Sequence, residues 1–467
     1  MAQQLDARLR DHLAQRTGLL TPSPDGMASA AGPAVRPVLV LLDRTFDIAT
    51  PVQHAWTYQP LCADLLGLRL NRVTVSSSGP ASGGAAAGGG PAGAKKSYDV
   101  DPEADPFWAA HAGSQFPKVA EEVEAELQKY KSAVAAVNRA TEAAASAGDR
   151  LDSSGAADAH LMSAVSSLPE LTERKKLIDK HTGMATALLG AIKTRTLDAF
   201  CLTEEDILSG RGDKAAVAAL LSGPKGSPED RVRLAIIATL AAESAPSQAD
   251  ADATDASLRA GGADVAALAY VRSLRAFNLT GSSGTSAASG GMGTSGGVSA
   301  GVAALGGGAS QSNLLDWADR ALGQGLNAVA KGVNRLLAAG RTLPVARIVE
   351  AVLEGRPGSE ADDFLVFDPK SPRPGPMPGS SLTQMQAPQT QQGGSGAAAA
   401  VRRDAIVFVV GGGSYVEHRA LQELMTAKQT SPGAGARTIV YGSTDMLSGS
   451  EFTTQLAELG RRMGGGP

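Results

Sequence analysis

The clearest structural signal in this 467-residue chain is the segment Arg36-Pro-Val-Leu-Val-Leu-Leu-Asp-Arg-Thr-Phe-Asp-Ile-Ala-Thr-Pro51. Its apolar run from Val38 to Leu42 has no polar alternation, which predicts a strand covered on both faces, as in a parallel sheet. Asp43, Arg44 and Asp47 follow at the carboxyl end of that strand, where open α/β sheets place ligand or partner sites. These charges could therefore serve chemistry or fix a turn that a proline closes.

A second strand of the same kind lies near the carboxyl end, at Ala405-Ile-Val-Phe-Val-Val410. It runs into Gly411–Gly413 and then into a predicted helix, and a third strand follows at Arg437–Tyr441. A β-α-β-α order requires parallel pairing and right-handed crossovers. Neither end of the chain supplies enough strands alone. We therefore predict one α/β sheet built from both ends, interrupted by a large and mainly helical inserted domain.

The intervening residues show helical patterns. Ser167-Leu-Pro-Glu170 combines a capping box with a proline just inside a helix start, and Ser227-Pro-Glu-Asp230 caps another helix. Residues 314–353 add further helical pattern. Apolar residues at spacings of three and four predict a long amphipathic helix, which carries Val119, Val123, Leu127, Tyr130, Val134 and Val137. Such stripes on long helices favour an elongated helical arm over a compact pocket.

Composition sets the expected domain boundaries. Three tracts, at 76–94, 281–310 and 371–400, are rich in Gly, Ala, Ser and Pro, which is typical of flexible linkers or loop insertions. The predicted organisation is a residual helix and linker at 1–34, the first half of the α/β domain at 35–105, a helical arm domain at 106–370, a disordered linker at 371–400 and the second half of the α/β domain at 401–467.

Charge and cysteine content exclude several classes of protein. The formal net charge is −4 with mixed signs throughout, so there is no basic stripe for nucleic acid or for an anionic membrane surface. Cys62 and Cys201 give neither a disulfide framework nor metal spacing, which fits a reducing, cytosolic compartment. No run approaches the roughly 18 apolar residues of an integral membrane segment. The six histidines are dispersed, and no cofactor or metal is predicted.

The carboxylates after the first strand have two interpretations. Asp43 and Asp47 could act as paired acids or metal ligands, although no third carboxylate or histidine cluster accompanies them locally. Alternatively, Asp43 pairs with Arg44 and braces a turn closed by Pro51. The second interpretation makes these residues part of the scaffold.

The glycine run near the carboxyl end is also ambiguous. Gly411, Gly412 and Gly413 lie between a strand and a helix and could cradle a phosphate on helix amides. The sequence matches neither GxGxxG nor GxxxxGK[ST], and no lysine follows. Three glycines equally permit a tight turn with close helix–strand packing. The alternative function is therefore a nucleotide- or phosphate-binding α/β enzyme that uses this loop with Asp43 and Asp47.

The opening segment, taken with His54-Ala-Trp-Thr-Tyr58, resembles the signature of the SM (Sec/Munc) family of SNARE regulators. The pattern is most similar to the Sly branch, which serves traffic between endoplasmic reticulum and Golgi. The resemblance covers nearly everything from Leu5 to Gly460 except the Gly/Ala-rich tracts. Further matching motifs are Ser97-Tyr-Asp99, Phe107-Trp108, Ser163-Ala-Val-Ser-Ser-Leu-Pro-Glu-Leu171, Ile178-Asp-Lys-His-Thr182, Gly226-Ser-Pro-Glu-Asp230, Phe367-Asp-Pro369, Ile406-Val-Phe-Val-Val-Gly-Gly-Gly-Ser-Tyr415 and Tyr441-Gly-Ser443.

The resemblance implies an arch-shaped, non-enzymatic protein of three domains, in which an α/β domain is interrupted by a helical one. It implies that the chain binds syntaxin-type and other SNARE proteins, and assembled SNARE bundles, and templates SNARE assembly during vesicle docking and fusion. The implied protein uses no cofactor. We expect a cytoplasmic monomer that associates peripherally with endoplasmic reticulum and Golgi membranes through its SNAREs.

The family's helical domain has a hairpin whose tip templates SNARE helices. By position, we expect this hairpin at about Leu197 to Pro224, with Leu220 and Leu221 as candidate SNARE contacts; ordinary helix packing is the other interpretation of these leucines. The family's first domain, an α/β unit that captures the amino-terminal peptide of a syntaxin, has no counterpart in the matched motifs. Only its trailing helix is expected here, around Leu5–Leu13.

Overall fold

The computed structural model describes residues 1–15, 37–76, 95–147, 154–281, 341–355, 359–369, 404–429 and 438–464. Two compact units contain them. We call Met1–Pro51 with Arg341–Phe452 the sheet unit, and Val52–Gly340 with Thr453–Pro467 the helical unit. Apart from Ser76 and Gly281, the three predicted low-complexity tracts lie outside the described residues, as does the helical pattern predicted for residues 314–340.

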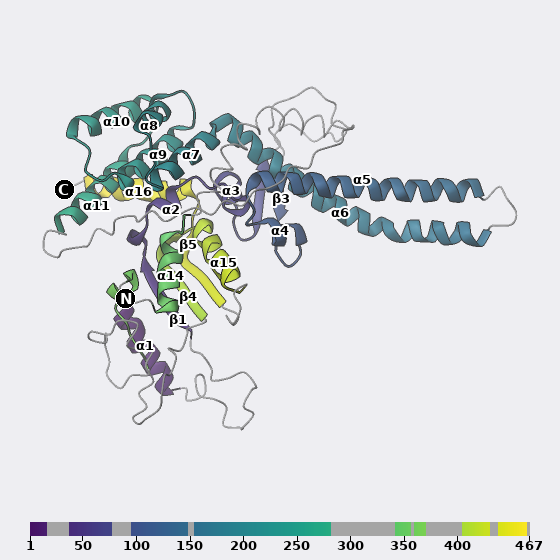
Figure 1. Cartoon of the computed structure of the whole chain (residues 1–467), viewed down its shortest axis with the longest axis horizontal. Helices are drawn as coiled ribbons and strands as arrows, with labels where there is room; N and C mark the ends of the chain where they lie inside the picture. The colour runs from purple at the N-terminus through teal and green to yellow at the C-terminus, as the bar shows by residue number, and fades with distance from the viewer. Residues whose placement is uncertain are drawn as a thin grey trace. The chain divides into compact units, whose positions relative to one another are not determined.

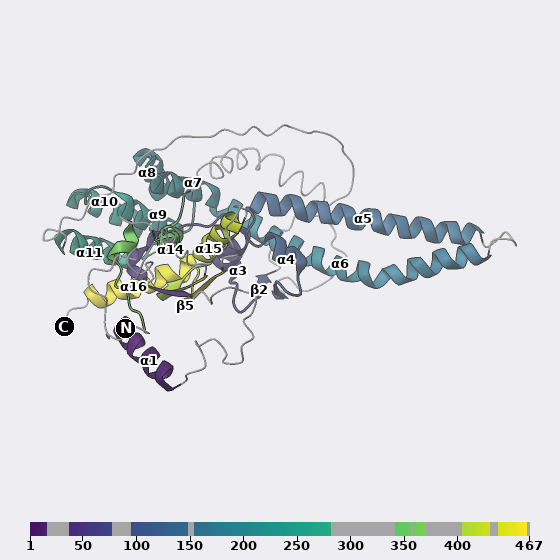
Figure 2. The same ribbon diagram turned by 60° about the horizontal axis from the view of Figure 1, so that its bottom comes forward.

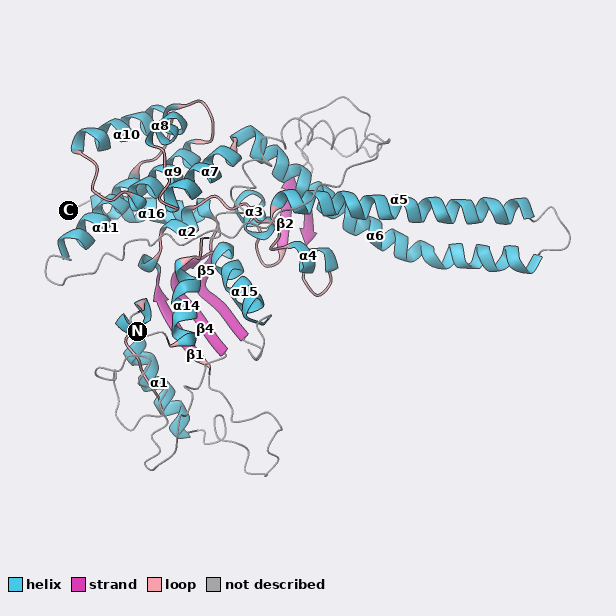
Figure 3. Ribbon diagram, in the orientation of Figure 1, coloured by secondary structure: helices cyan, strands magenta, loops and turns pink. Residues whose placement is uncertain are grey.

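A three-stranded parallel sheet forms the centre of the sheet unit (Figure 3). Its strand order is β1-β4-β5, and the register places Val38 opposite Ala405 and Asp43 opposite Val410. The sheet therefore joins segments from opposite ends of the chain, which confirms the predicted α/β fold with a large helical insert. The strands are β1 (Val38–Asp43), β4 (Asp404–Gly413) and β5 (Thr438–Met446).

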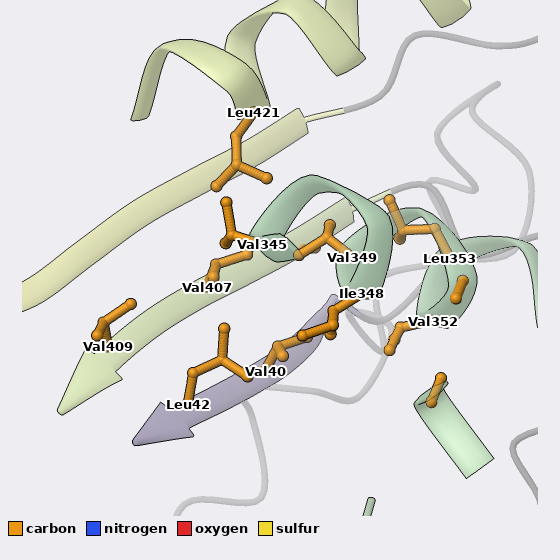
Figure 4. Packing of buried hydrophobic residues seen from close by; sticks show 13 residues of the cluster. Val40, Leu42, Val345, Ile348, Val349, Val352, Leu353, Val407, Val409 and Leu421 are labelled. Atoms are coloured by element: carbon orange, nitrogen blue, oxygen red, sulfur yellow. The ribbon is translucent and has the colours of Figure 1, made fainter. Parts of the chain in front are cut away.

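One face of this sheet is covered by two helices, α14 (Pro344–Glu354) and α15 (Tyr415–Gln429). Because successive strand residues point to opposite faces, alternate residues of β1 and β4 reach the same core. Figure 4 shows these strand side chains against α14 and Leu421 of α15. The labelled core residues are Val40, Leu42, Val345, Ile348, Val349, Val352, Leu353, Val407, Val409 and Leu421.

The opposite sheet face is more open. Leu39 is 42% exposed, Ile406 is 41% exposed and Val440 is 54% exposed. The expectation that apolar strands are covered on both faces is therefore not met within the part of the chain that the structure describes. The alternation of burial along β1 comes from the packing partners, because its sequence is apolar on both sides.

The amino-terminal helix α1 (Ala2–Gln15) belongs to the sheet unit. Its Asp6 is buried and accepts a hydrogen bond from Arg10 at 2.8 Å, and Arg10 also donates to the carbonyl of Asp368 at 2.7 Å. The expected helix around Leu5 is therefore present and attached to this unit. The remaining short elements are η1 (Arg44–Phe46), α2 (Ala49–Val52) and η3 (Glu360–Asp363).

Helices dominate the helical unit (Figure 3), which also contains a separate two-stranded antiparallel sheet formed by β2 and β3. Strand β2, which begins at Arg72, therefore pairs locally and does not join the main sheet. The last helix, α16, begins in the sheet unit and ends in the helical unit. The elements are α3 (Tyr58–Leu66), β2 (Arg72–Ser76), β3 (Lys95–Asp99), α4 (Pro106–His111), α5 (Phe116–Ala147), α6 (Ser154–Arg195), α7 (Leu197–Leu208), α8 (Lys214–Ser222), α9 (Pro228–Ala241), α10 (Gln248–Ala260), α11 (Ala266–Gly281) and α16 (Gly449–Gly464).

The two longest helices, α5 and α6, lie side by side as an antiparallel hairpin in both views (Figures 1 and 2). They contain 32 and 42 residues, which at about 1.5 Å per residue gives lengths of about 48 and 63 Å. The predicted helix start at Ser167 is wrong, because α6 begins at Ser154 and continues through Pro169. A proline inside a helix removes one backbone hydrogen bond. The helix nevertheless continues to Arg195.

Candidate functional site

Arg44 lies just beyond β1. Its buried guanidinium forms an ion pair with the buried carboxylate of Glu417. Its Nη1 and Nη2 donate to the Glu417 carboxylate at 2.9 and 2.8 Å, and Nη1 also donates to the carbonyl of Gly412 at 2.9 Å. Burial alone would lower the pKa of Arg44, but the hydrogen bonds and charge of Glu417 raise it, so the guanidinium stays charged. Arg44 therefore connects the end of β1 to the start of α15.

The two aspartates of this turn accept hydrogen bonds from threonines two or three residues further along the chain. Asp43 accepts hydrogen bonds from the amide of Thr45 at 2.9 Å and from its hydroxyl at 2.5 Å, and these bonds lower the pKa of Asp43. Asp47 accepts from the amide and hydroxyl of Thr50, at 3.1 and 2.5 Å, at the start of the short helix that contains Pro51. Both carboxylates thus cap turns, and the expected pairing of Asp43 with Arg44 is replaced by the pairing of Arg44 with Glu417.

The glycine loop is filled by neighbouring side chains. Gly411 has φ +123°, and a Cβ built there would lie 2.6 Å from Cβ of Arg44. A Cβ on Gly412 would overlap the side chain of Leu447, and one on Gly413 would lie 2.5 Å from the hydroxyl oxygen of Ser443. These glycines are therefore needed for close packing at a bulge in β4.

Glu417 and Tyr441 were not identified from the sequence, although they complete this cluster. The hydroxyl of Tyr441 donates to Glu417 at 2.6 Å, and the backbone amide of Glu417 lies 3.3 Å from the hydroxyl of Ser414. The Ser-x-x-Glu spacing at Ser414 was a capping-box signal that could have marked Glu417. No local pattern links either residue to Arg44, because Glu417 is 373 residues away in sequence.

The base of the α5–α6 hairpin is attached to the rest of the helical unit by His181. Its Nε2 lies 3.0 Å from Asp105, and its Nδ1 lies 3.0 Å from the hydroxyl of Tyr58. Burial is the main cause that lowers the pKa of His181, so a neutral ring fits, with Nε2–H donating to Asp105 and the Tyr58 hydroxyl donating to Nδ1. Asp105 also caps α4 through the amide of Trp108 at 2.9 Å. These contacts fix the position of α6 at this point.

Beyond this base, the hairpin carries apolar side chains that its own packing does not bury. Met162 is 77% exposed and Leu168 is 50% exposed, both on α6. On α5, Val134 and Val137 are half-buried. A pair of long helices with exposed apolar positions is the geometry on which an amphipathic helix of a partner packs.

The segment in which the SNARE-templating hairpin is expected, at about Leu197 to Pro224, forms the two short helices α7 and α8. Leu220 and Leu221 lie in α8, which has no fully buried residue. Both side chains are half-buried. The structure therefore separates the long hairpin from these two leucines, which lie together on a short helix with a partly open surface.

Within the described residues, no group of three His, Cys, Asp or Glu side chains is arranged to hold a metal ion. In the same part of the chain, no helix is both long and apolar enough to cross a membrane.

Comparison with known proteins identifies the architecture. The sequence pattern of the Sec1 family matches residues 1–455. This chain belongs to the Sec1 family. The chain is 38% identical to the SEC1 family transport protein SLY1 of Oryza sativa subsp. japonica over 471 residues, which cover 99% of this chain and 64% of the relative. It is also 38% identical to SLY1 of Arabidopsis thaliana, with 100% of this chain and 65% of the relative covered.

Solved structures agree with this Sec1 assignment. A crystal structure of Sly1p in complex with an N-terminal peptide of Sed5p superposes with a TM-score of 0.65 and 25% identity. The superposition covers 98% of this chain and 62% of that one. The family resemblance inferred from sequence motifs is therefore confirmed, and the chain spans slightly less than two thirds of the length of these relatives.

Proposed function

We propose that this Sec1-family chain binds syntaxin-type and other SNARE proteins, and assembled SNARE bundles, and templates their assembly during vesicle docking and fusion. The observation that carries the proposal is its similarity, over nearly its whole length, to SLY1 transport proteins and to Sly1p crystallised with a Sed5p peptide. The transport step is between endoplasmic reticulum and Golgi and within the Golgi. The chain acts as a cytoplasmic monomer that reaches these membranes through its SNAREs.

The helical unit is the binding surface in this proposal. SNARE motifs form long amphipathic helices, and holding such helices in register lowers the entropic cost of their assembly. The α5–α6 hairpin supplies length and exposed apolar side chains, including Leu168. Leu220 and Leu221 on α8 supply a second, shorter apolar surface. Either surface accepts the apolar face of a helix.

Binding without catalysis is the mode of action that we propose. The carboxylates of Asp43 and Asp47 accept hydrogen bonds from Thr45 and Thr50, which occupy them in turns. The loop at Gly412 is packed against Leu447. These contacts support a structural role for the residues that the enzyme hypothesis required.

A pull-down with purified cytoplasmic segments of early-Golgi SNAREs tests the proposal and separates the two surfaces. One variant carries Leu220→Arg with Leu221→Arg, and another carries Leu168→Arg. Leu365→Arg is the matched control, because Leu365 is an exposed leucine of the sheet unit. We expect the unmodified chain and the control to retain a SNARE, and at least one of the other variants to lose it.

A further inference from the structure

A cluster of ionisable side chains lies in the interior of the helical unit, where α3, α6, α7 and α9 meet the segment at residues 52–57. Three members are acids and two are arginines, and a histidine lies at the centre. Four of the six have side chains no more than 2% exposed, and the two arginines donate to the acids. The members are His54, Asp64, Arg195, Glu204, Asp230 and Arg233.

His54 is held between carboxylates on two different helices. Its Nδ1 lies 2.7 Å from Glu204 of α7, and its Nε2 lies 3.1 Å from Asp230 of α9. Its backbone amide also donates to the second oxygen of Glu204 at 2.7 Å. An ionised carboxylate can only accept a hydrogen bond. Both ring nitrogens must therefore carry hydrogen for both bonds to form, and the ring is then an imidazolium.

Charge balance leads to the same conclusion. Arg195 donates to Asp230, and Arg233 donates to Asp64 at 2.8 Å. These two arginines neutralise two of the three acids and leave the charge of Glu204 unmatched. A buried charge without a partner is strongly unfavourable. Protonated His54 supplies the missing positive charge, so the cluster is neutral only when the ring is doubly protonated.

Two other groups near the ring, Arg233 and Cys201, bind backbone carbonyls of this segment. They do not supply the positive charge that Glu204 needs. Arg233 donates to the carbonyls of Val52 and Gln53 at 2.6 and 3.1 Å, on one side of His54. The thiol of Cys201 on α7 donates to the carbonyl of His54 at 3.4 Å. Neither group offers an additional charge to Glu204 at hydrogen-bonding distance.

We propose that His54 is a proton-operated latch: the doubly protonated ring fastens residues 52–57 to α7 and α9, and loss of one ring proton weakens that attachment. Burial and Arg233 oppose the charged ring, but Glu204 and Asp230 outweigh them and raise the pKa of His54 above its ordinary value. The attachment is therefore at full strength below about pH 6.5, the usual histidine pKa, and weakens as pH rises through the pKa of the closed state.

Hydrogen exchange on the full chain tests the latch through the amides of residues 52–57, with protection corrected for the intrinsic exchange rate at each pH. Protection in the unmodified chain should be constant below about pH 6.5. It should then fall by up to tenfold per pH unit, and level off above the pKa of the closed state. A profile that does not fall with pH would overturn the proposal.

Glu204→Gln is the matched variant, because a glutamine removes the unmatched negative charge and keeps the hydrogen bonds. Its amide can donate to Nδ1 while Nε2–H of a neutral His54 donates to Asp230. We expect this variant to fold and to show pH-independent protection at residues 52–57. A pH profile identical to that of the unmodified chain would contradict the latch. Nitrogen chemical shifts of His54 give an independent readout: a neutral ring at pH 6 in the unmodified chain would also overturn it.

Discussion

Replacing Arg44 by methionine removes the connection between β1 and α15 while keeping most of the apolar volume of the side chain. The change deletes hydrogen bonds to both oxygens of Glu417, to the carbonyl of Gly412 and to the carbonyl of Asp47. Glu417 is fully buried, and among the described residues it would keep as donors the hydroxyls of Tyr441 and Ser414.

The loss of stability in Arg44→Met follows from the buried negative charge of Glu417, which the substitution leaves without its cation. Removing one partner of a buried ion pair costs about 3–5 kcal/mol, most of it from the charge left behind. Because two hydroxyl donors remain at Glu417, we expect a loss of stability at the lower end of this range, about 3 kcal/mol. Adding Glu417→Gln to Arg44→Met removes the buried charge. The double variant should therefore be more stable than Arg44→Met alone, even though it carries one more substitution.

Native-state hydrogen exchange at the amides of β1 and β4 is the assay, because it reads the opening free energy of the sheet unit directly. Leu365→Arg, an exposed substitution in the same unit, serves as the control. If Arg44→Met lowers the opening free energy of the sheet unit by less than about 1 kcal/mol, the structural role of this ion pair is refuted. A double variant less stable than the single one would refute the reasoning from unmatched charge.

Three further substitutions test other parts of the structure. Gly412→Val should lower the opening free energy of β4 by about 1–3 kcal/mol in the same exchange experiment, because its side chain overlaps Leu447. Gly226→Ala should lower the thermal midpoint, since Gly226 has φ +78° and a Cβ there would lie 2.5 Å from the ring of Phe200. Asp105 has a pKa of about 2: burial alone would raise it, but hydrogen bonds from its neighbours lower it. Its contribution is complete above about pH 4 and is lost as pH falls through about 2, so the difference in unfolding midpoint between Asp105→Asn and the unmodified chain should shrink from pH 5 to pH 2.

Local signals in the sequence located several elements correctly. The apolar run at Val38–Leu42 is a strand, and Ser227 and Asp230 form the predicted capping box, with hydrogen bonds of 3.2 and 2.7 Å. These features depend on residues close together in the chain, which is why pattern alone could find them.

Features that depend on distant partners were not predictable in this way. One interpretation of the sequence pairs Arg44 with its neighbour Asp43, but the structure pairs it with Glu417. The capping pattern before Pro169 suggested a helix start, whereas the helix passes through it. At Arg44 a contact between residues distant in sequence replaces the local pairing, and at Ser167 a helix that begins earlier passes through the capping pattern.

Binding of purified SNAREs to the chain is the most direct test of the proposed templating function. The unmodified chain is titrated with the cytoplasmic segment of a syntaxin-type SNARE and with an assembled SNARE bundle, beside the Leu168→Arg, Leu220→Arg/Leu221→Arg and Leu365→Arg variants. We predict saturable binding by the unmodified chain and by Leu365→Arg, and a loss of at least about tenfold, or 1.4 kcal/mol, in one of the helical-unit variants. Unchanged binding by both of those variants, or no binding by the unmodified chain, would contradict SNARE templating by the helical unit.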